Sequence, residues 1–348
     1  MEVFAAIRIL ILFALAFVTA LLITPFVSYL LHKFNLKKKN IRDAQTAPVF
    51  NKFHQGKAST PTMGGVIIWG TVVLLAAIFF IFAKIFDGFA SYFDFVNRAE
   101  TYLPLAALFF SAIVGLADDI FGILGKGPKG GGLSVLQKLG LYFLVATVGA
   151  WWFYFKLHWT TFYIPFVGGI EVGFWYIPIF IFILAATAFS ANEADGLDGL
   201  AGGTLFFAFG SLAVVSFVLG RYDLAAMNGV ILGALLAFLW FNIYPARFFM
   251  GDTGSMSLGI TLGIMAMLTN TALLLPFFAF IPMMESLSVI VQLTSKKLRK
   301  KKIFHSTPIH HHFEALGWPE SQITMRFWIL SAVMCIVGLV VFFLYRFF

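Results

Sequence analysis

Charge and cysteine are both scarce in this sequence. Only 11% of its 348 residues are charged, whereas a soluble globular domain is about a quarter charged, so an ordinary soluble domain is excluded. The single cysteine, Cys335, excludes an intrachain disulfide. The first apolar run has no small-residue cleavage site, so we expect it to be a spanning segment and not a removable secretory signal.

Apolar residues make up 60% of the chain. They recur in runs of about twenty, which is the length that a helix needs to cross a bilayer. The sequence therefore predicts an all-α polytopic membrane protein, in which residues 1–348 form a single integral membrane domain. About ten spans are expected, at residues 9–31, 62–83, 103–117, 135–155, 175–191, 200–219, 224–243, 256–270, 272–294 and 326–346.

The formal net charge of +8 is unevenly distributed along the chain. Of the 24 Lys and Arg residues, 18 fall in one set of loops and 6 in the other. The positive-inside rule places the first set in the cytoplasm, so both termini are predicted to be extracytoplasmic. A basic protein could bind nucleic acid, but this distribution indicates membrane topology and an anionic substrate, and we expect no nucleic-acid partner.

One external loop has the pattern of a β-hairpin. Residues 160–174 contain two β-prone runs on either side of Gly168 and Gly169. Such a glycine pair is typical of a two-residue hairpin turn. We therefore expect a small external β-hairpin that turns at these glycines.

The stretch FSANEADGLDGLAGG at 189–203 is polar although apolar runs flank it. An Asp costs about 2.5–3.5 kcal/mol at the centre of a membrane helix, so several acids here indicate a function. In a helix, Asn192, Asp195 and Asp198 would share one face because they are spaced by three. The alternative is a short polar loop between two spans, and both interpretations stay open at this stage.

Further acids fall on the same predicted side of the membrane. Asp118 and Asp119 follow the third expected span, and Asp252 follows the seventh. Mg²⁺ binds one or two carboxylates together with waters and substrate phosphates. Because the ends of separate helical hairpins can meet, we expect these acids to converge on a Mg²⁺ site.

The residues around Asp252 predict a turn that enters a helix. Gly251 and Gly254 bracket the aspartate. Free N–H groups and the helix dipole make such a turn a ready anion site, where Asp252 would hold a metal beside a phosphate. Capping of the helix by Asp252 or Ser255 is an alternative that can hold at the same time.

The motif KASTPTMGG at 57–65 predicts a helix start near Thr62. Gly64 and Gly65 favour close helix packing inside a membrane. Lys57 is the functional candidate of this motif, as a counter-charge to a phosphate.

The motif PIHHHFE at 308–314 contains three consecutive histidines. Neighbouring side chains on a helix point about 100° apart, so the three cannot all face one metal. We expect them to donate hydrogen bonds to a sugar, a peptide or a phosphate.

Taken together, these motifs resemble the polyprenyl-phosphate N-acetylhexosamine-1-phosphate transferase superfamily. Within it, the chain is similar to the phospho-N-acetylmuramoyl-pentapeptide transferases, the MraY family. The resemblance covers nearly the whole chain, and the histidine motif is its most specific part. The matching segments are KASTPTMGG at 57–65, GLADD at 115–119, NEADGLDGLAGG at 192–203, FNIYPARFFMGDTGS at 241–255 and PIHHHFE at 308–314.

The resemblance implies a ten-span, usually dimeric enzyme of the bacterial inner membrane, with its active site on the cytoplasmic face. Such an enzyme transfers phospho-MurNAc-pentapeptide from its UDP carrier to undecaprenyl phosphate and requires Mg²⁺. The products are UMP and lipid I, the first lipid-linked peptidoglycan precursor. Membrane lipid surrounds such a protein.

The resemblance also implies roles for matching residues. Asp252 would be the main Mg²⁺ ligand, and Asp118 and Asp119 would serve the metal and the lipid phosphate. The catalytic set would be these three with Lys57 and His310. The nucleotide side would comprise Asn192, Asp195, Gly196, Leu197, Asp198 and Phe249. Further substrate contacts would come from Thr62, Lys138, Asn242, Gln292, His311 and His312.

The sequence departs from the family pattern in two places. Glu193 and Ala194 stand where the family usually has Leu-Thr, and Gly122 stands where it usually has Lys. Both departures concern the phosphate contacts. Two other functions compete with this interpretation. A sibling transferase would use UDP-GlcNAc, and a secondary transporter would use intramembrane acids to couple ions to substrate.

Overall fold

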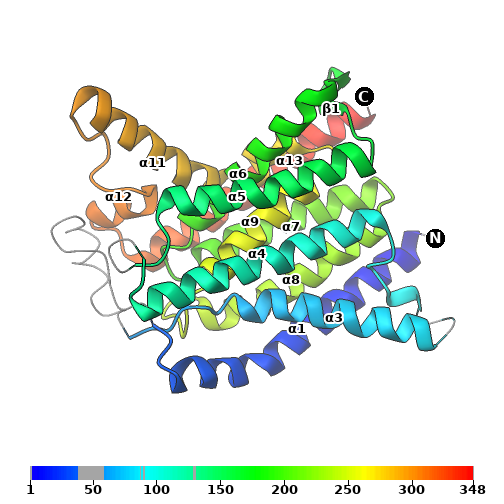
Figure 1. Cartoon of the computed structure of the whole chain (residues 1–348), viewed down its shortest axis with the longest axis horizontal. Helices are drawn as coiled ribbons and strands as arrows, with labels where there is room; N and C mark the ends of the chain where they lie inside the picture. Colours follow the sequence, from blue (N-terminus) through cyan, green and yellow to red (C-terminus); the bar gives the residue numbers. More distant parts are fainter. Residues whose placement is uncertain (1, 38–58, 87, 89–90, 128–130, 348) are drawn as a thin grey trace.

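The computed structural model describes residues 2–37, 59–86, 88, 91–127 and 131–347 (Figure 1). These residues form a bundle of long helices with one small hairpin. The long helices are α1 (Glu2–Lys33), α3 (Val66–Ile85), α4 (Ala99–Leu124), α5 (Val135–Trp151), α6 (Tyr176–Glu193), α7 (Leu200–Val218), α8 (Tyr222–Asn242), α9 (Asp252–Leu268), α11 (Phe280–Arg299) and α13 (Glu320–Phe347). The short elements are η2 (Ser91–Phe93), η4 (Trp152–Lys156), η5 (Gly173–Trp175), η6 (Ala272–Leu274), α10 (Leu275–Phe278) and α12 (Ile309–Ala315).

The mostly helical, multi-pass architecture is confirmed, but among the described residues fewer than ten helices have the length and apolar composition of a simple span. Within the described residues, 8 helices are long and apolar enough to cross a membrane, or 9 if the bent pair formed by α10 and α11 counts as one span. Each predicted range overlaps a helix. The differences lie in α9, which has only 17 residues, and in the bent pair.

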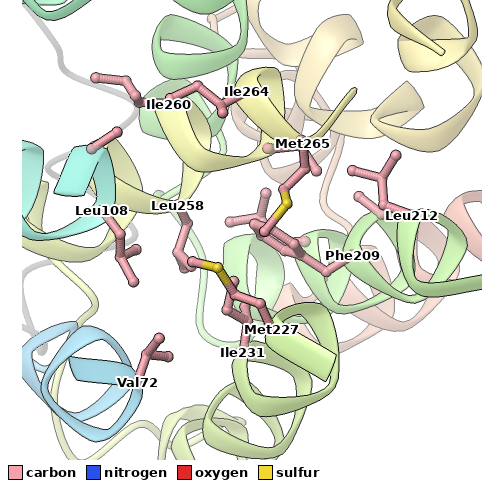
Figure 2. Packing of buried hydrophobic residues seen from close by; sticks show 14 of the residues in the cluster. Val72, Leu108, Phe209, Leu212, Met227, Ile231, Leu258, Ile260, Ile264 and Met265 are labelled. Carbon is pink, nitrogen blue, oxygen red and sulfur yellow. The ribbon is translucent and has the colours of Figure 1, made fainter. Parts of the chain in front are cut away.

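Helix α9 is the centre of the bundle, and all of its residues are buried. A helix that is buried all round has no polar face to turn toward water. Figure 2 shows Leu258 and Met265 of α9 beside Met227 of α8 and Phe209 of α7. Helices α4 and α6 pack along α9 as well. The start of α9 is therefore held by several elements at once, and this positions Asp252.

Small residues let the helices around α9 approach closely. A Cβ added at Gly259 would lie 2.7 Å from the Cα of Ala188 in α6. A Cβ at Gly65 would lie 2.5 Å from the backbone N of Gly254. The prediction that Gly64 and Gly65 serve close packing is thus confirmed, as expected for small residues in membrane bundles.

The helix start predicted near Thr62 is wrong, because α3 begins at Val66. The preceding residues bond through their backbone to the segment before α9. Gly64 N donates to Phe249 O and Gly65 N to Met250 O, both at 2.8 Å, and Phe249 N donates to Pro61 O at 2.8 Å. This segment therefore gives its backbone hydrogen bonds to the site loop instead of to a helix.

The bend between α10 and α11 measures 90°. Pro282 lies in the first turn of α11 and has no N–H to donate to the carbonyl of Phe278, so one hydrogen bond of a continuous helix is missing there. The thiol of Cys335 donates to that carbonyl at 3.4 Å. Beyond the bend, α11 projects away from the bundle (Figure 1).

The two termini lie at one end of the bundle, and α12 lies at the other (Figure 1). This agrees with the prediction that both termini are on the same side of the membrane. The side itself stays a prediction. At the terminal end, Arg8 of α1 is buried and donates to Asp223 Oδ1 and to Asp94 O, each at 2.9 Å.

The predicted hairpin is present, formed by β1 (Thr161–Ile164) and β2 (Gly168–Glu171). The strands are antiparallel, and Tyr163 pairs with Gly169. The turn lies at residues 165–167, so the prediction that it would lie at the two glycines is wrong. Gly169 is part of a strand, where a Cβ would come within 2.8 Å of the Thr161 side chain.

Candidate active site

Asp118 and Asp119 lie inside α4, in its last two turns, and not after the span as predicted. The helix continues to Leu124 and ends at Gly125, which has the left-handed conformation (φ 69°) that glycine adopts easily. Adjacent helical residues point about 100° apart. The two aspartates therefore reach different partners.

Asp118 faces a small recess between α4, α5 and α9. Its Oδ1 accepts the N–H of Leu133 at 2.5 Å, and its Oδ2 lies 2.8 Å from the ammonium of Lys138. The same ammonium lies 2.7 Å from Oδ1 of Asp252. Two carboxylates from separate helices thus converge on one cationic atom.

Asn192 completes this group from the end of α6. Its Nδ2 donates to Oδ1 of Asp252 at 2.5 Å and to Oγ of Ser255 at 3.1 Å. Because the amide of Asn192 is bonded to both Asp252 and Ser255 of α9, it holds the Asp252 carboxylate in one orientation. The recess is lined by Val114, Gly115, Asp118, Leu133, Lys138, Leu141, Tyr142, Asp252 and Met256, and its volume is about 10 Å³.

The start of α9 binds carboxylates of the protein itself. Gly251 N donates to Oδ2 of Asp195 at 2.9 Å, and Thr253 N donates to Oδ2 of Asp119 at 3.0 Å. The prediction that these N–H groups would be available to a phosphate is therefore wrong. The physical reason is that the helix dipole favours any nearby negative charge, and the buried Asp119 and the half-buried Asp195 already provide it.

Asp252 does not cap α9 in the predicted way. The N-cap is Gly251, whose positive φ of 75° favours glycine, and Asp252 is the first helical residue. Its side chain points to Lys138 and Asn192 instead of to the backbone of its own helix. The alternative of N-capping by Asp252 is wrong, and the residue is directed toward the recess.

The stretch between α6 and α7 forms a loop, so of the two interpretations the polar loop is correct. Helix α6 ends at Glu193, and α7 begins after Gly199, whose φ of 76° interrupts a right-handed helix. The polar side chains diverge from this loop. Asn192 reaches Asp252, whereas Asp198 Oδ2 accepts the N–H of Ala246 at 3.0 Å.

Asn242 connects this loop to the segment before α9. Its Oδ1 accepts the N–H of Gly199 at 3.1 Å, and its Nδ2 donates to Phe248 O at 2.8 Å. Both the oxygen and the nitrogen of the amide bond the protein backbone, so Asn242 holds the α6–α7 loop against the segment before α9. Leu197 is also buried, in a cluster with Leu200 and Phe327.

The three histidines of α12 point in different directions, as the sequence predicts. Nδ1 of His310 lies 2.9 Å from Oε2 of Glu285 in α11. Nδ1 of His311 lies 2.6 Å from Oε2 of Glu314, and Nδ1 of His312 accepts the N–H of His305 at 3.2 Å. His310 and His312 therefore contact residues outside the motif, whereas His311 contacts Glu314 within it.

His310 lies against the α6–α7 loop. A Cβ added at Gly196 would come within 2.6 Å of the His310 ring. The histidine motif and the acidic loop are thus in direct contact, although 114 positions separate them in the sequence.

The pKa of His312 lies below its usual range. Burial disfavours the charged ring, and the nearby His305 adds repulsion. The ring is neutral at pH 7 as a result, which agrees with its Nδ1 accepting a hydrogen bond.

Glu285 is a site residue that the motif analysis missed. It is fully buried and binds both the ring and the N–H of His310, the latter at 3.3 Å. The signal was available, because Glu285 lies inside the apolar range expected for the ninth span, where an acid is costly. Next to it, Oγ of Ser286 lies 2.8 Å from Oγ of Ser190 in α6.

Gln292 is near the motif but bonds its own chain. Its Oε1 accepts the N–H groups of Ile303 and Phe304 at 2.9 and 3.1 Å, and its Nε2 donates to Phe304 O at 2.9 Å. Its side chain therefore fixes the loop after α11. Lys57 lies outside the described residues. Thr62 is buried, and a Cβ added at Gly251 would come within 2.7 Å of its hydroxyl.

The chemistry at the recess fits a hard divalent cation. Asp118 and Asp252 already place carboxylate oxygens on either side of one positive charge. The described residues contain no cluster of three or more His, Cys, Asp or Glu suited to a metal. Two carboxylates without a full protein cage match Mg²⁺, which keeps waters or substrate phosphates as its other ligands.

Known proteins are similar to this chain over the region that contains the recess. Residues 101–270, which contain Asp118, Asn192 and Asp252, match the family model Glycosyl transferase family 4. A phospho-N-acetylmuramoyl-pentapeptide-transferase of Clostridium novyi is 38% identical, and the match covers 93% of each chain.

Other relatives have the same name. One of Clostridium perfringens is 38% identical over 95% of this chain and 98% of its own. One of Chloroflexus aggregans is 34% identical over 95% of this chain and 89% of its own. Identity at this level over almost the full length of both proteins shows the family: this chain belongs to the phospho-N-acetylmuramoyl-pentapeptide transferases.

Proposed function

We propose that this protein transfers phospho-MurNAc-pentapeptide from its UDP carrier to undecaprenyl phosphate, releasing UMP and forming lipid I. The observation that carries this proposal is the convergence of Asp118 and Asp252 on one cation position. The site lies toward one end of a membrane bundle, where a water-soluble nucleotide and a lipid phosphate can both reach it. The names of the relatives supply the substrates.

The bond changes follow from the substrates. An oxygen of the lipid phosphate attacks the β-phosphorus of the donor and forms a new P–O bond. The bond from that phosphorus to the oxygen bridging the two phosphates breaks, and UMP leaves with the electron pair. Such a transfer depends on positioning and charge neutralisation more than on covalent help from the protein.

Each residue at the recess has a role in this scheme. Asp118 and Asp252 would hold Mg²⁺, which supplies charge neutralisation at the diphosphate. Asn192 keeps the Asp252 carboxylate in place. Lys138 forms ion pairs with the same two aspartates in the structure. His310, His311 and His312 would contact the muramoyl-peptide part of the donor.

Direct attack is favoured over an aspartyl-phosphate intermediate. Both oxygens of Asp118 are engaged, one by the N–H of Leu133 and the other by Lys138. A phosphate monoester titrates near pH 6, so the lipid phosphate needs little help from a base near neutral pH.

We further propose that the protein resides in the bacterial cytoplasmic membrane, with the recess facing the cytoplasm, and that it forms homodimers. The many basic residues of the loops at that end support this orientation. The acidic residues lie at helix ends. A secondary transporter would have them near the bilayer midplane, so this placement counts against that alternative.

The test is a UMP-release assay. Purified protein is supplied with undecaprenyl phosphate, Mg²⁺ and either UDP-MurNAc-pentapeptide or UDP-GlcNAc. We expect UMP release with the muramoyl donor only. Release with UDP-GlcNAc alone would identify a sibling transferase, and release with neither donor would contradict the proposed function.

A further inference from the structure

Lys138 occupies the position that a metal ion would need. Its ammonium lies 2.8 Å from Oδ2 of Asp118 and 2.7 Å from Oδ1 of Asp252. These are the lengths of charge-assisted hydrogen bonds. The two carboxylates are buried, and about a fifth of the lysine side chain is exposed. The lysine therefore holds together two buried negative charges that would otherwise repel each other.

The segment that carries Lys138 is attached to the site at a second point. The N–H of Leu133 donates to the other oxygen of Asp118. Ser134 caps α5, since its Oγ accepts the N–H of Gln137 and its own N–H donates to Oε1 of Gln137. Lys138 follows in the first turn of a well-capped helix, so its backbone position is fixed. A movement of Lys138 would therefore be confined to its long side chain.

A divalent cation and the lysine cannot share this position. Mg²⁺ lies about 2.1 Å from its oxygen ligands, so an ion bound to both Asp118 and Asp252 would lie in nearly the same place as the ammonium. Binding of the ion therefore requires the ammonium to leave.

The geometry points to an exchange that rests on the proposed function: Lys138 is a built-in counter-ion that a divalent cation displaces from Asp118 and Asp252. Displacement frees the ammonium to turn toward the exposed side of the recess, where an anionic diphosphate can bind it. Metal binding would thus create the positive site that the nucleotide donor needs.

The net charge of the recess explains why the divalent cation would bind before the anionic donor. Asp118, Asp252 and Lys138 together have a net charge of about −1 without the ion and about +1 with it. An anionic donor is repelled by the first state and attracted by the second. By linkage, the donor must strengthen metal binding by the same factor by which the metal strengthens donor binding.

The exchange makes an unusual prediction for metal affinity. Lys138→Met keeps the length of the side chain and removes its charge, so the ion no longer competes with an ammonium. In the absence of substrates, we expect the dissociation constant of Mn²⁺, used as a probe for Mg²⁺, to fall at least tenfold. Asp252→Asn should change it in the opposite direction. A lysine that only supports the fold would leave the constant unchanged or raise it.

The measurement uses the full chain purified in detergent, with neither donor nor lipid phosphate. Free Mn²⁺ is followed by its electron paramagnetic resonance signal during titration. The matched control is Lys126→Met, which removes an exposed lysine from the same connection between α4 and α5. The control should bind Mn²⁺ like the unchanged protein. Equal or weaker binding by folded Lys138→Met would overturn the exchange.

A second measurement needs no variant. Lys138 of the unchanged protein is acetylated under limiting conditions, and the extent of modification is read by peptide mass spectrometry. We expect low modification in EDTA and several-fold higher modification in Mn²⁺, whereas Lys126 should be modified equally in both. Modification of Lys138 that does not respond to Mn²⁺ would contradict the exchange. UMP release is scored separately, so failure of the exchange and failure of the proposed function give different results.

Discussion

Asp252 receives two polar contacts at the recess, and both are made to one of its oxygens. Both Lys138 and Asn192 bond the same oxygen, Oδ1. The residue begins the central helix, yet its side chain contributes no cap to that helix. The charge of Asp252 therefore matters for the cation position and not for capping α9. A substitution that removes only the charge tests this difference.

We predict that Asp252→Asn lowers the rate of UMP release about a hundredfold or more, in line with other electrostatic groups at reacting centres. The substitution keeps the size of the side chain and removes one negative charge from the cation position. The assay is UMP release against Mg²⁺ concentration, with the unfolding temperature as a folding control. Near-normal turnover at low Mg²⁺ would show that the metal binds elsewhere, and Asp118 would be the next candidate.

Glu285 differs from Asp252 in that it contacts His310 and would affect donor binding through the position of that ring. We predict that Glu285→Ala destabilises the protein by about 1–3 kcal/mol, since it leaves buried N–H groups without an acceptor. It should also raise the KM for the muramoyl donor by loosening the histidine ring. Glu285→Gln is the matched control, because its amide oxygen can still accept from His310, and it should recover most of both losses. Identical kinetics for all three proteins would exclude a positioning role.

The lowered pKa of His312 gives a pH dependence. Its folded-state pKa is below the unfolded value of about 6.5, so the unfolded chain binds the proton more readily. Stability is therefore unaffected above that value and falls as the pH drops below it. The unfolding temperature should decrease less between pH 7.5 and 5.5 in His312→Gln than in the unchanged protein. An equal decrease would assign the effect to other groups.

At the scale of helices, the positions of the elements were predictable and their ends were not. Runs of apolar residues marked each long helix because burial in lipid requires them. In α4, the polar pair Asp118 and Asp119 interrupts the apolar run, but the helix continues through both residues to Leu124. The bend at α10 and α11 depends on Pro282 and on a tertiary contact from Cys335, which a local pattern does not contain.

Close packing of α6 against α9 depends on one glycine. We predict that Gly259→Ala destabilises the protein by about 1–3 kcal/mol, because the new methyl group would overlap backbone atoms of Ala188. Gly210→Ala in α7 is the matched control, since a Cβ there meets nothing within 4 Å. The control should be neutral or stabilising by about 0.5–1 kcal/mol, as for alanine in a helix interior. Unfolding in detergent measures both, and equal effects would contradict this account of the packing.

At the scale of the whole molecule, the bundle brings distant segments to one end. Four different elements contribute the polar residues Asp118, Asn192, Asp252 and His310. Each could be recognised in the sequence because lipid disfavours polar side chains. Their distances could not be predicted, because they depend on how helices pack around α9. This is why the bridge by Lys138 and the support by Glu285 emerged only from the structure.

The orientation of the bundle is the prediction that decides where the site can act. The terminal end, with Ser91 exposed, should face outward, and the end with Lys297 exposed should face the cytoplasm. An impermeant maleimide should label Ser91→Cys in intact cells and should label Lys297→Cys only after the membrane is opened. The native Cys335 is buried, so its background labelling should be low. The reverse pattern would place the recess outside, away from any cytoplasmic UDP-sugar, and would contradict both the orientation and the proposed donor.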